Sequence, residues 1–231
     1  MITRKLNYLL IAVFAISVAF MSCDPNNDDD NNGNGNGNGG GNGSEPEKEW
    51  VEINGVKWAT RNVDKPGTFA AKSEDAGMFY QWNRKIGWSS KDPLVNSNGG
   101  TTWNDSDEPG DVWEKANDPC PAGYRMPTRE EHTSLAAADS KWDTKNGVKG
   151  CTFGSGNTTI FLPAAGFRNY RIGKLTSNGT DGNYWSTDTR SYIGEITGYN
   201  LHFYYASGNV SVNPNAYDDK PCGNTIRCVK E

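Results

Sequence analysis

Residues and motifs that mark many enzymes and nucleic-acid-binding proteins are scarce in this sequence. Only two histidines occur, and there is no Cys-x-x-Cys, His-x-x-x-His or Gly-x-Ser-x-Gly spacing. Neither a zinc site nor a serine-hydrolase nucleophile is indicated, and no metal or cofactor is expected. Acidic residues outnumber basic ones, 28 against 23, for a net charge of −5. A nucleic-acid partner is not expected, because phosphate contacts need a basic face.

Long hydrophobic runs are also lacking, except near the N-terminus. Arg4 and Lys5 precede the apolar run 9–20, which Met-Ser-Cys-Asp-Pro follows. A membrane-spanning helix needs about 20 apolar residues, so this run is too short to cross comfortably. The pattern is typical of an export signal, and we expect a cleaved signal peptide over residues 1–22. An uncleaved anchor is the alternative.

The sequence Ala-Phe-Met-Ser-Cys at 19–23 resembles a lipobox, in a loose form similar to that of Bacteroidetes lipoproteins. The resemblance implies cleavage before Cys23 and attachment of lipid to its thiol. The acidic run Asp28–Asp30 resembles the signal that sends some of these lipoproteins to the outer face, although it could equally be a solubilising run of charge. We expect an outer-membrane protein exposed at the cell surface, with a periplasm-facing orientation as the alternative.

The composition changes abruptly near residue 50. Residues 23–49 are rich in asparagine and glycine and have almost no apolar side chains, so they are expected to form a disordered tether. All eight tryptophans lie in residues 50–231, which are long enough for one domain with its own core.

Four cysteines follow Cys23, namely Cys120, Cys151, Cys222 and Cys228. In an exported chain an even number predicts two disulfides, and three pairings are open. Zinc is the competing interpretation, but the separation of six between Cys222 and Cys228 does not match a zinc motif.

One helix and several short strands are indicated. Thr128 and Glu131 form a capping box after Pro127, and Leu135 continues the apolar pattern, so a helix is expected from Thr128 onward. Strands are expected at 56–63, 159–162, 199–205 and 225–229, separated by Gly, Asn and Pro turns. The pattern favours an α+β domain with small antiparallel sheets, one main helix and long loops.

Four motifs occur in the same order as in a known family. They are Asp-Pro-Cys-Pro-Ala-Gly-Tyr-Arg-Met-Pro-Thr-Arg-Glu-Glu at 118–131, Leu-Pro-Ala-Ala-Gly-Phe-Arg at 162–168, Tyr-Trp-Ser-Thr at 184–187 and Ile-Arg-Cys-Val-Lys at 226–230. Together they resemble the Fibrobacter succinogenes major paralogous domain, which implies a C-type-lectin-like fold. In that fold Cys120 and Cys228 come together, which leaves Cys151 to pair with Cys222. The rival is a local bridge between Cys222 and Cys228.

Two segments before the helix carry oxygen ligands that calcium would accept. Trp-Asn-Asp at 103–105 is similar to the calcium-binding tripeptide of sugar-binding lectins, but there the tripeptide follows the helices. The acidic loop 105–111 lacks EF-hand spacing, since Ala116 stands where a glutamate would be needed. We favour a coincidental match for the tripeptide and a solvated surface loop for the acidic segment.

An enzyme remains the main alternative to a binding domain. The stretch 123–131 also resembles formylglycine-generating, sulfatase-modifying domains, which use two reactive cysteines, and here only Cys222 and Cys228 qualify. His132 and His202 are more simply surface or satisfied core residues than general bases.

Exposed aromatic rings are the remaining candidates, because they can stack on sugars. Trp88, Trp103, Tyr204 and Tyr217 are the candidate ligand-binding residues, and of the adjacent Tyr204 and Tyr205 only one should face outward. We expect a lectin-like domain that binds glycan or protein without catalysis. A structural subunit of a surface or fimbrial assembly is the second alternative.

Overall fold

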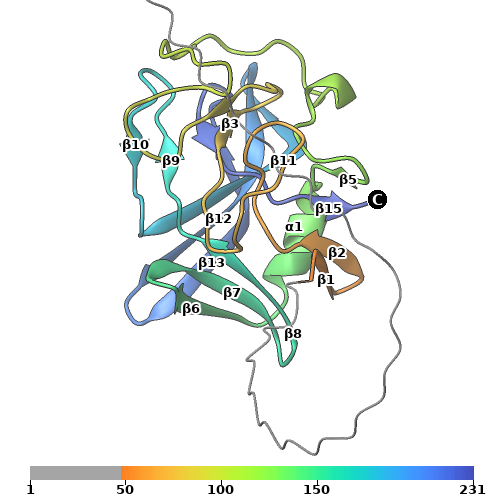
Figure 1. Ribbon diagram of the computed structural model, residues 1–231. Helices are drawn as coiled ribbons and strands as arrows, with labels where there is room; N and C mark the ends of the chain where they lie inside the picture. Colours follow the sequence, from red (N-terminus) through yellow and green to blue (C-terminus); the bar gives the residue numbers. More distant parts are fainter. Residues whose placement is uncertain (1–47) are drawn as a thin grey trace, which may run out of the picture. The chain divides into compact units, whose positions relative to one another are not determined.

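The computed structural model describes residues 48–231, so the predicted signal peptide, Cys23 and nearly all of the tether lie outside the described residues. The first strand begins at Trp50, where the sequence predicted the start of the domain. Small antiparallel sheets make up most of the regular secondary structure in this part of the chain, and they accompany one α-helix (Figure 1). Within residues 48–231, no helix has the length and apolar character needed to span a membrane.

The strands form four sheets. The first has the order β1 (Trp50–Ile53), β2 (Val56–Ala59), β15 (Val229–Lys230) and β5 (Tyr124–Arg125). The second has the order β10 (Leu175–Thr176), β9 (Phe167–Arg168), β14 (Gly223–Asn224), β3 (Phe79–Gln81) and β4 (Gly87–Trp88). The third consists of β11 (Asp181–Tyr192), β12 (Glu195–Ala206) and β13 (Asn209–Asp218), and the fourth of β6 (Ser140–Lys145), β7 (Val148–Ser155) and β8 (Thr158–Pro163). The strands expected at 159–162 and 199–205 are confirmed as β8 and β12. Of the strand expected at 56–63 only the first half forms, as β2, and of the strand expected at 225–229 only Val229 lies in a strand, β15.

The helix α1 (Arg129–Ala136) begins as its sequence predicts. The Thr128 side chain accepts a hydrogen bond from the Glu131 amide (3.2 Å), and the Glu131 carboxylate accepts one from the Thr128 amide (2.8 Å). Arg125 donates to both carboxylate oxygens of Glu131, at 2.8 and 2.7 Å. The Tyr-Arg-Met-Pro-Thr motif therefore fixes the start of the helix through a cap and a two-pronged ion pair. A short 3-10 helix, η1 (Lys115–Asn117), precedes it.

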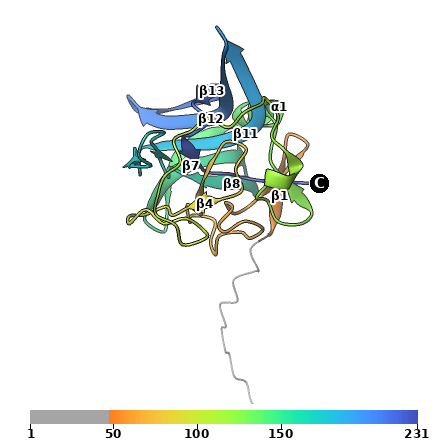
Figure 2. The same ribbon diagram turned by 90° about the horizontal axis from the view of Figure 1, so that it is seen from above.

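The β11–β13 sheet packs against core clusters on both of its faces. Tyr184 of β11 contributes to one buried cluster, together with Leu201 and Phe203 of β12. The next residue, Trp185, contributes to a second cluster that includes Trp82. Successive strand residues point to opposite faces, so this sheet lies between the two clusters. Beyond the clusters, one end of the sheet projects from the rest of the domain (Figure 2).

The C-terminal segment completes both clusters. Val229 of β15 pairs with Trp58 of β2 on one side and with Arg125 of β5 on the other. Ile226 and Cys228 are fully buried in the second cluster, while Val229 belongs to the first. Segments from the two ends of the domain therefore share one sheet and one core.

Candidate functional site

Of the four candidate ligand-binding aromatics, Trp88 is a core residue, so the prediction for it is wrong, whereas Trp103 is partly buried against the same cluster. Trp88 is 3% exposed and packs against Trp103, with 4.9 Å between ring centroids. The indole N–H of Trp103 donates to the Tyr170 carbonyl at 2.8 Å. The Trp88 ring is covered because β4 pairs with β3 in the interior of the domain.

Tyr204 and Tyr217 are exposed, as predicted, but they lie toward different ends of the β11–β13 sheet. Tyr204 stacks on His202 at 5.2 Å, and Tyr217 lies under the Arg190 guanidinium at 4.0 Å. Tyr205 is exposed as well, stacked on Trp142 at 5.7 Å. The expectation that only one of the adjacent tyrosines faces outward is wrong, because neither face of this end of β12 is covered by the core.

The cysteines form one of the two predicted bridges. Cys120 is bonded to Cys228 across a sequence separation of 108, with 6.1 Å between Cα atoms. Cys151 and Cys222 are free and buried, so the predicted second bridge does not form. The reason is their placement, since Cys151 lies in the first core cluster and Cys222 in the second. The bond from Cys120 also excludes the rival bridge between Cys222 and Cys228.

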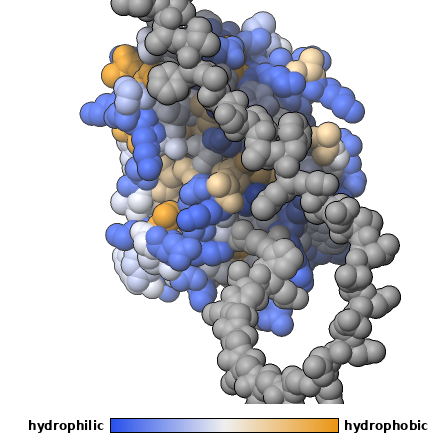
Figure 3. Space-filling view, viewed as in Figure 1, coloured by the Kyte–Doolittle hydropathy of each residue, from blue (hydrophilic) through white to orange (hydrophobic). Residues whose placement is uncertain are grey.

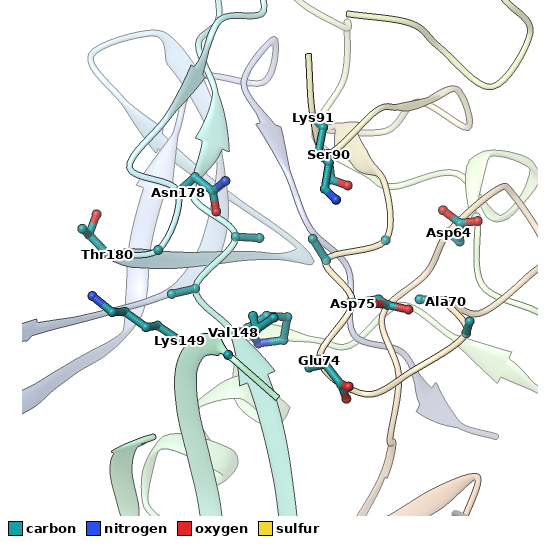
Figure 4. Close-up of a pocket in the computed structure, with 18 residues that line it drawn as sticks. Asp64, Ala70, Glu74, Asp75, Ser90, Lys91, Val148, Lys149, Asn178 and Thr180 are labelled. Atoms are coloured by element: carbon teal, nitrogen blue, oxygen red, sulfur yellow. The ribbon is translucent and has the colours of Figure 1, made fainter. Parts of the chain in front are cut away.

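The main cleft of the domain has a volume of about 710 Å³ (Figure 4). Its lining comes from segments far apart in sequence: loops 64–77 and 90–91, the turn and start of β7 at 147–149, the end of β8 with 163–165, and loop 178–180. Small apolar residues are prominent in it: Ala71 is exposed and Ala76 is half-buried, above the buried Ala70, Ala164 and Ala165. This volume lies in the range of about 300–1,000 Å³ that holds small ligands.

Charge is divided between opposite sides of the cleft. Figure 4 shows Asp64, Glu74 and Asp75 on one side and Lys149 on the other, with Lys91 above. Asn178, Thr180 and Ser90 add neutral polar side chains, and no aromatic side chain lines the cleft. The lining therefore offers hydrogen bonds and both signs of charge, which suits a polar ligand.

The acidic side is held in place by the β6–β7 turn. Glu74 is buried and accepts a hydrogen bond from the Asn146 amide at 2.7 Å. This bond, opposed by burial and assisted by Ser73, holds the pKa of the Glu74 carboxyl below its usual value. Lys145 donates to the Ser73 hydroxyl at 2.5 Å. Glu74 is thus ionised and already bound, and one oxygen of Asp75 accepts from the Lys72 amide at 3.0 Å. The Asp64 carboxylate and the other Asp75 oxygen carry the charge that is open to a ligand.

Two fully buried arginines support the cleft. Arg168 donates to the carbonyls of Ser89, Lys91 and Gly173, at 2.9, 3.0 and 2.6 Å. Arg227 donates to the Ala59 carbonyl, the Phe161 carbonyl and the Asn62 side chain. The first fixes the loop that carries Lys91, and the second ties β8 to the N-terminal sheet. The sequence did not predict these roles, although Arg168 is the last residue of the motif at 162–168 and Arg227 the second residue of the motif at 226–230.

The remaining candidate residues are structural. His132 is buried and stacks on Trp58 at 5.7 Å, but neither ring nitrogen has a hydrogen-bond partner, so it is not the satisfied histidine that was expected.

Arg84 pairs with Glu108 of the acidic loop at 3.2 Å, and Lys220 donates to the Glu108 carbonyl at 2.8 Å. In residues 48–231, no three His, Cys, Asp or Glu side chains are grouped to hold a metal ion.

Comparison with protein-family models, with curated proteins and with solved structures finds no match. The resemblance carried by the four sequence motifs therefore stays a prediction, and the cleft must be interpreted from its own chemistry.

Proposed function

We propose that this chain is a lipid-anchored protein of the outer membrane, displayed on the cell surface, whose lectin-like domain binds a polar glycan without catalysis. The observation that carries the proposal is the charged cleft of about 710 Å³. Its lining residues sit on loops that buried side chains hold in place, so little order has to be gained on binding. Pre-organised polar groups of this kind bind hydroxyl-rich ligands at low entropic cost.

Several features support the lectin-like part of the proposal. The domain combines small antiparallel sheets, one helix and long ordered loops, and a disulfide joins the approach to α1 to the last strand. These are the features that the resemblance to the major paralogous domain implied. The arginines of the motifs also have structural roles. Arg125 donates to the Glu131 carboxylate at the start of α1, and Arg168 and Arg227 donate to backbone carbonyls of distant segments.

The sulfatase-modifying alternative requires a pair of reactive thiols. Cys228 is bonded to Cys120, and burial raises the pKa of the Cys222 thiol to about 12. A thiol with such a pKa is protonated at neutral pH and is a poor nucleophile. Labelling of the native protein with a thiol reagent tests this alternative, which predicts rapid modification of Cys222.

The binding proposal is tested with an array of bacterial, plant and host glycans, with and without a calcium chelator. For any glycan that binds, Lys149→Ala should weaken binding about tenfold or more, because a hydrogen bond to a charged group contributes about 1.5–3 kcal/mol. Lys141→Ala is the matched control, since this exposed lysine of β6 lies outside the cleft lining. Absence of any glycan ligand, or equal effects of the two variants, would contradict the proposal.

A structural role in a surface assembly is the second candidate function, and one observation favours it. The turn between β11 and β12 places Ile193 at the surface with 84% of its area exposed. The face of the domain in Figure 3 is mainly hydrophilic, with hydrophobic residues in small separate groups. Ile193 is the most exposed of the large hydrophobic residues among residues 48–231, ahead of Ile172 at 66% and Val112 at 60%.

A further inference from the structure

Four two-residue hairpin turns in this domain share one backbone conformation. Both residues have positive φ in Asn54–Gly55, Asn146–Gly147, Ser207–Gly208 and Ile193–Gly194, with the first residue at φ 50°, 48°, 52° and 50°. The first position of such a turn favours Asn, Asp or Gly, and three of the turns hold a small polar residue there. A β-branched residue at positive φ is strained. Ile193 therefore costs stability that an asparagine would not.

The apolar surface continues from this strained residue. Tyr192 and Ile196 flank the turn and are exposed, and Tyr217 of β13 is exposed nearby. Arg190 lies between the two tyrosine rings, 4.9 Å from Tyr192 and 4.0 Å from Tyr217. We call Tyr192, Ile193 and Ile196, with Arg190 and Glu195, the hairpin tip. Exposed Tyr, Ile and Arg side chains of this kind are typical of the centre of a protein interface.

Charge on the hairpin tip is divided in the same way as in the cleft. Arg190 stands on β11, and its guanidinium has no hydrogen-bond or ion-pair acceptor among residues 48–231. Glu195 stands on β12, across the turn, and is exposed. The cleft presents Asp64 and Asp75 on one side and Lys149 on the other (Figure 4). The hairpin tip thus places an apolar turn between a positively charged and a negatively charged residue. The cleft places alanines between an acidic and a basic side, so the two surfaces are complementary in charge and polarity.

We infer that the hairpin tip of one copy docks in the cleft of a second copy, with Ile193 against Ala71 and Ala76, Arg190 toward Asp64 and Asp75, and Glu195 toward Lys149. The inference rests on the proposed function in one respect, namely that the cleft is a binding site. Tip and cleft are different surfaces, so the contact is head-to-tail and each added copy exposes a new tip and a new cleft. The product is an open chain of copies, in keeping with the structural role in a surface assembly.

The experiment is sedimentation velocity of residues 24–231, which retain both core clusters and the disulfide. A contact made by one turn is small, so a Kd of about 1 µM to 1 mM is expected. Ile193→Asn removes the apolar residue and relieves the turn. It should weaken association at least tenfold while raising the Tm by roughly 2–4 °C. A loss of association that accompanies a gain in Tm does not reflect misfolding.

A mixing experiment tests the head-to-tail geometry. Ala71 lines the cleft and is exposed, so Ala71→Trp blocks the cleft and leaves the tip intact. Each variant alone should be monomeric, because Ile193→Asn lacks a tip and Ala71→Trp lacks a cleft. Their mixture should form 1:1 dimers and nothing larger, since one intact tip and one intact cleft remain.

A wild-type chain that stays monomeric throughout this range would overturn the inference, as would unchanged association of Ile193→Asn or a mixture that forms no dimer. If the hairpin tip binds a different protein and not a second copy, the wild-type chain will sediment as a monomer. Glycan binding is measured separately on Ile193→Asn, whose cleft is intact. Glycan binding by a monomeric wild type would refute self-association alone, and self-association without any glycan ligand would refute the glycan proposal alone.

Discussion

Replacing His132 by phenylalanine should remove a large part of the acid sensitivity of this domain. The imidazole is 1% exposed, stacks on Trp58, and has no hydrogen-bond partner at either nitrogen. Burial disfavours the charged form and lowers the pKa of His132 from 6.5 to about 3, against a smaller opposing effect of the Glu131 charge. His132 is therefore neutral in the folded chain over most of the acidic range.

The direction in which His132 changes folding stability with pH depends on whether the folded or the unfolded chain binds the proton first. Because the pKa of His132 is lower in the folded chain, the unfolded chain binds the proton first as the pH falls. Folding stability contributed by this group is thus present above pH 6.5 and is lost as the pH falls toward about 3. Between pH 7 and pH 4.5 the loss amounts to about 2.5 kcal/mol, at 1.36 kcal/mol for each pH unit.

The assay is urea unfolding followed by tryptophan fluorescence at pH 7, 6, 5 and 4.5. His132→Phe keeps an aromatic ring on Trp58 and removes two unpaired nitrogens. Its free energy of unfolding should exceed that of the wild type by an amount that grows by about 2 to 3 kcal/mol between pH 7 and pH 4.5. Burial raises the pKa of the Asp218 carboxyl, which has the opposite effect on stability, but this term is common to both proteins and cancels in the difference.

Leu135→Ala is the control, because Leu135 is buried on the same helix and does not titrate. It should lower the free energy of unfolding by about 2–5 kcal/mol at every pH. Its curve against pH should run parallel to that of the wild type. If the curve for His132→Phe is also parallel, the lowered pKa of His132 and the reasoning from its burial are refuted.

Three further predictions concern the bridge, the helix cap and the anchor. Replacing Cys120 and Cys228 together by serine should lower the free energy of unfolding by about 4–5 kcal/mol, measured in urea, because the bridge closes a long loop of the unfolded chain; a loss below 1 kcal/mol would contradict this. Thr128→Ala should cost about 1 kcal/mol, since the Glu131 amide loses its acceptor, and a Tm equal to that of the wild type would count against the cap. Cys23→Ala should abolish incorporation of a palmitate analogue, and label retained by the variant would show that lipid is attached elsewhere.

The parts of the fold that could be predicted are those set by neighbouring residues. Thr128 and Glu131 are three residues apart, so their reciprocal cap is readable from the sequence and is confirmed. The change of composition near Trp50 likewise marks the first strand. The Cys120–Cys228 bond was implied by the family resemblance that the motifs carry. The residues alone left three pairings open, because separation along the chain does not select one of them.

The parts that could not be predicted depend on contacts between distant segments. Trp88 is buried only because β3, β4 and the loop held by Arg168 come together around it. Cys151 and Cys222 were expected to form a disulfide with each other. They lie in different core clusters, and the β11–β13 sheet lies between these clusters. The cleft draws its lining from five separate segments, and no local pattern of residues announces it.

The position of β15 has a consequence for biosynthesis. While Val229, Cys228 and Arg227 are still in the ribosome, β2 lacks its neighbour β15, both clusters are open and the Phe161 carbonyl lacks its guanidinium partner. The domain therefore closes only after its final residues have emerged. The core and the Cys120–Cys228 bond are therefore completed at the same late stage, when β15 pairs with β2.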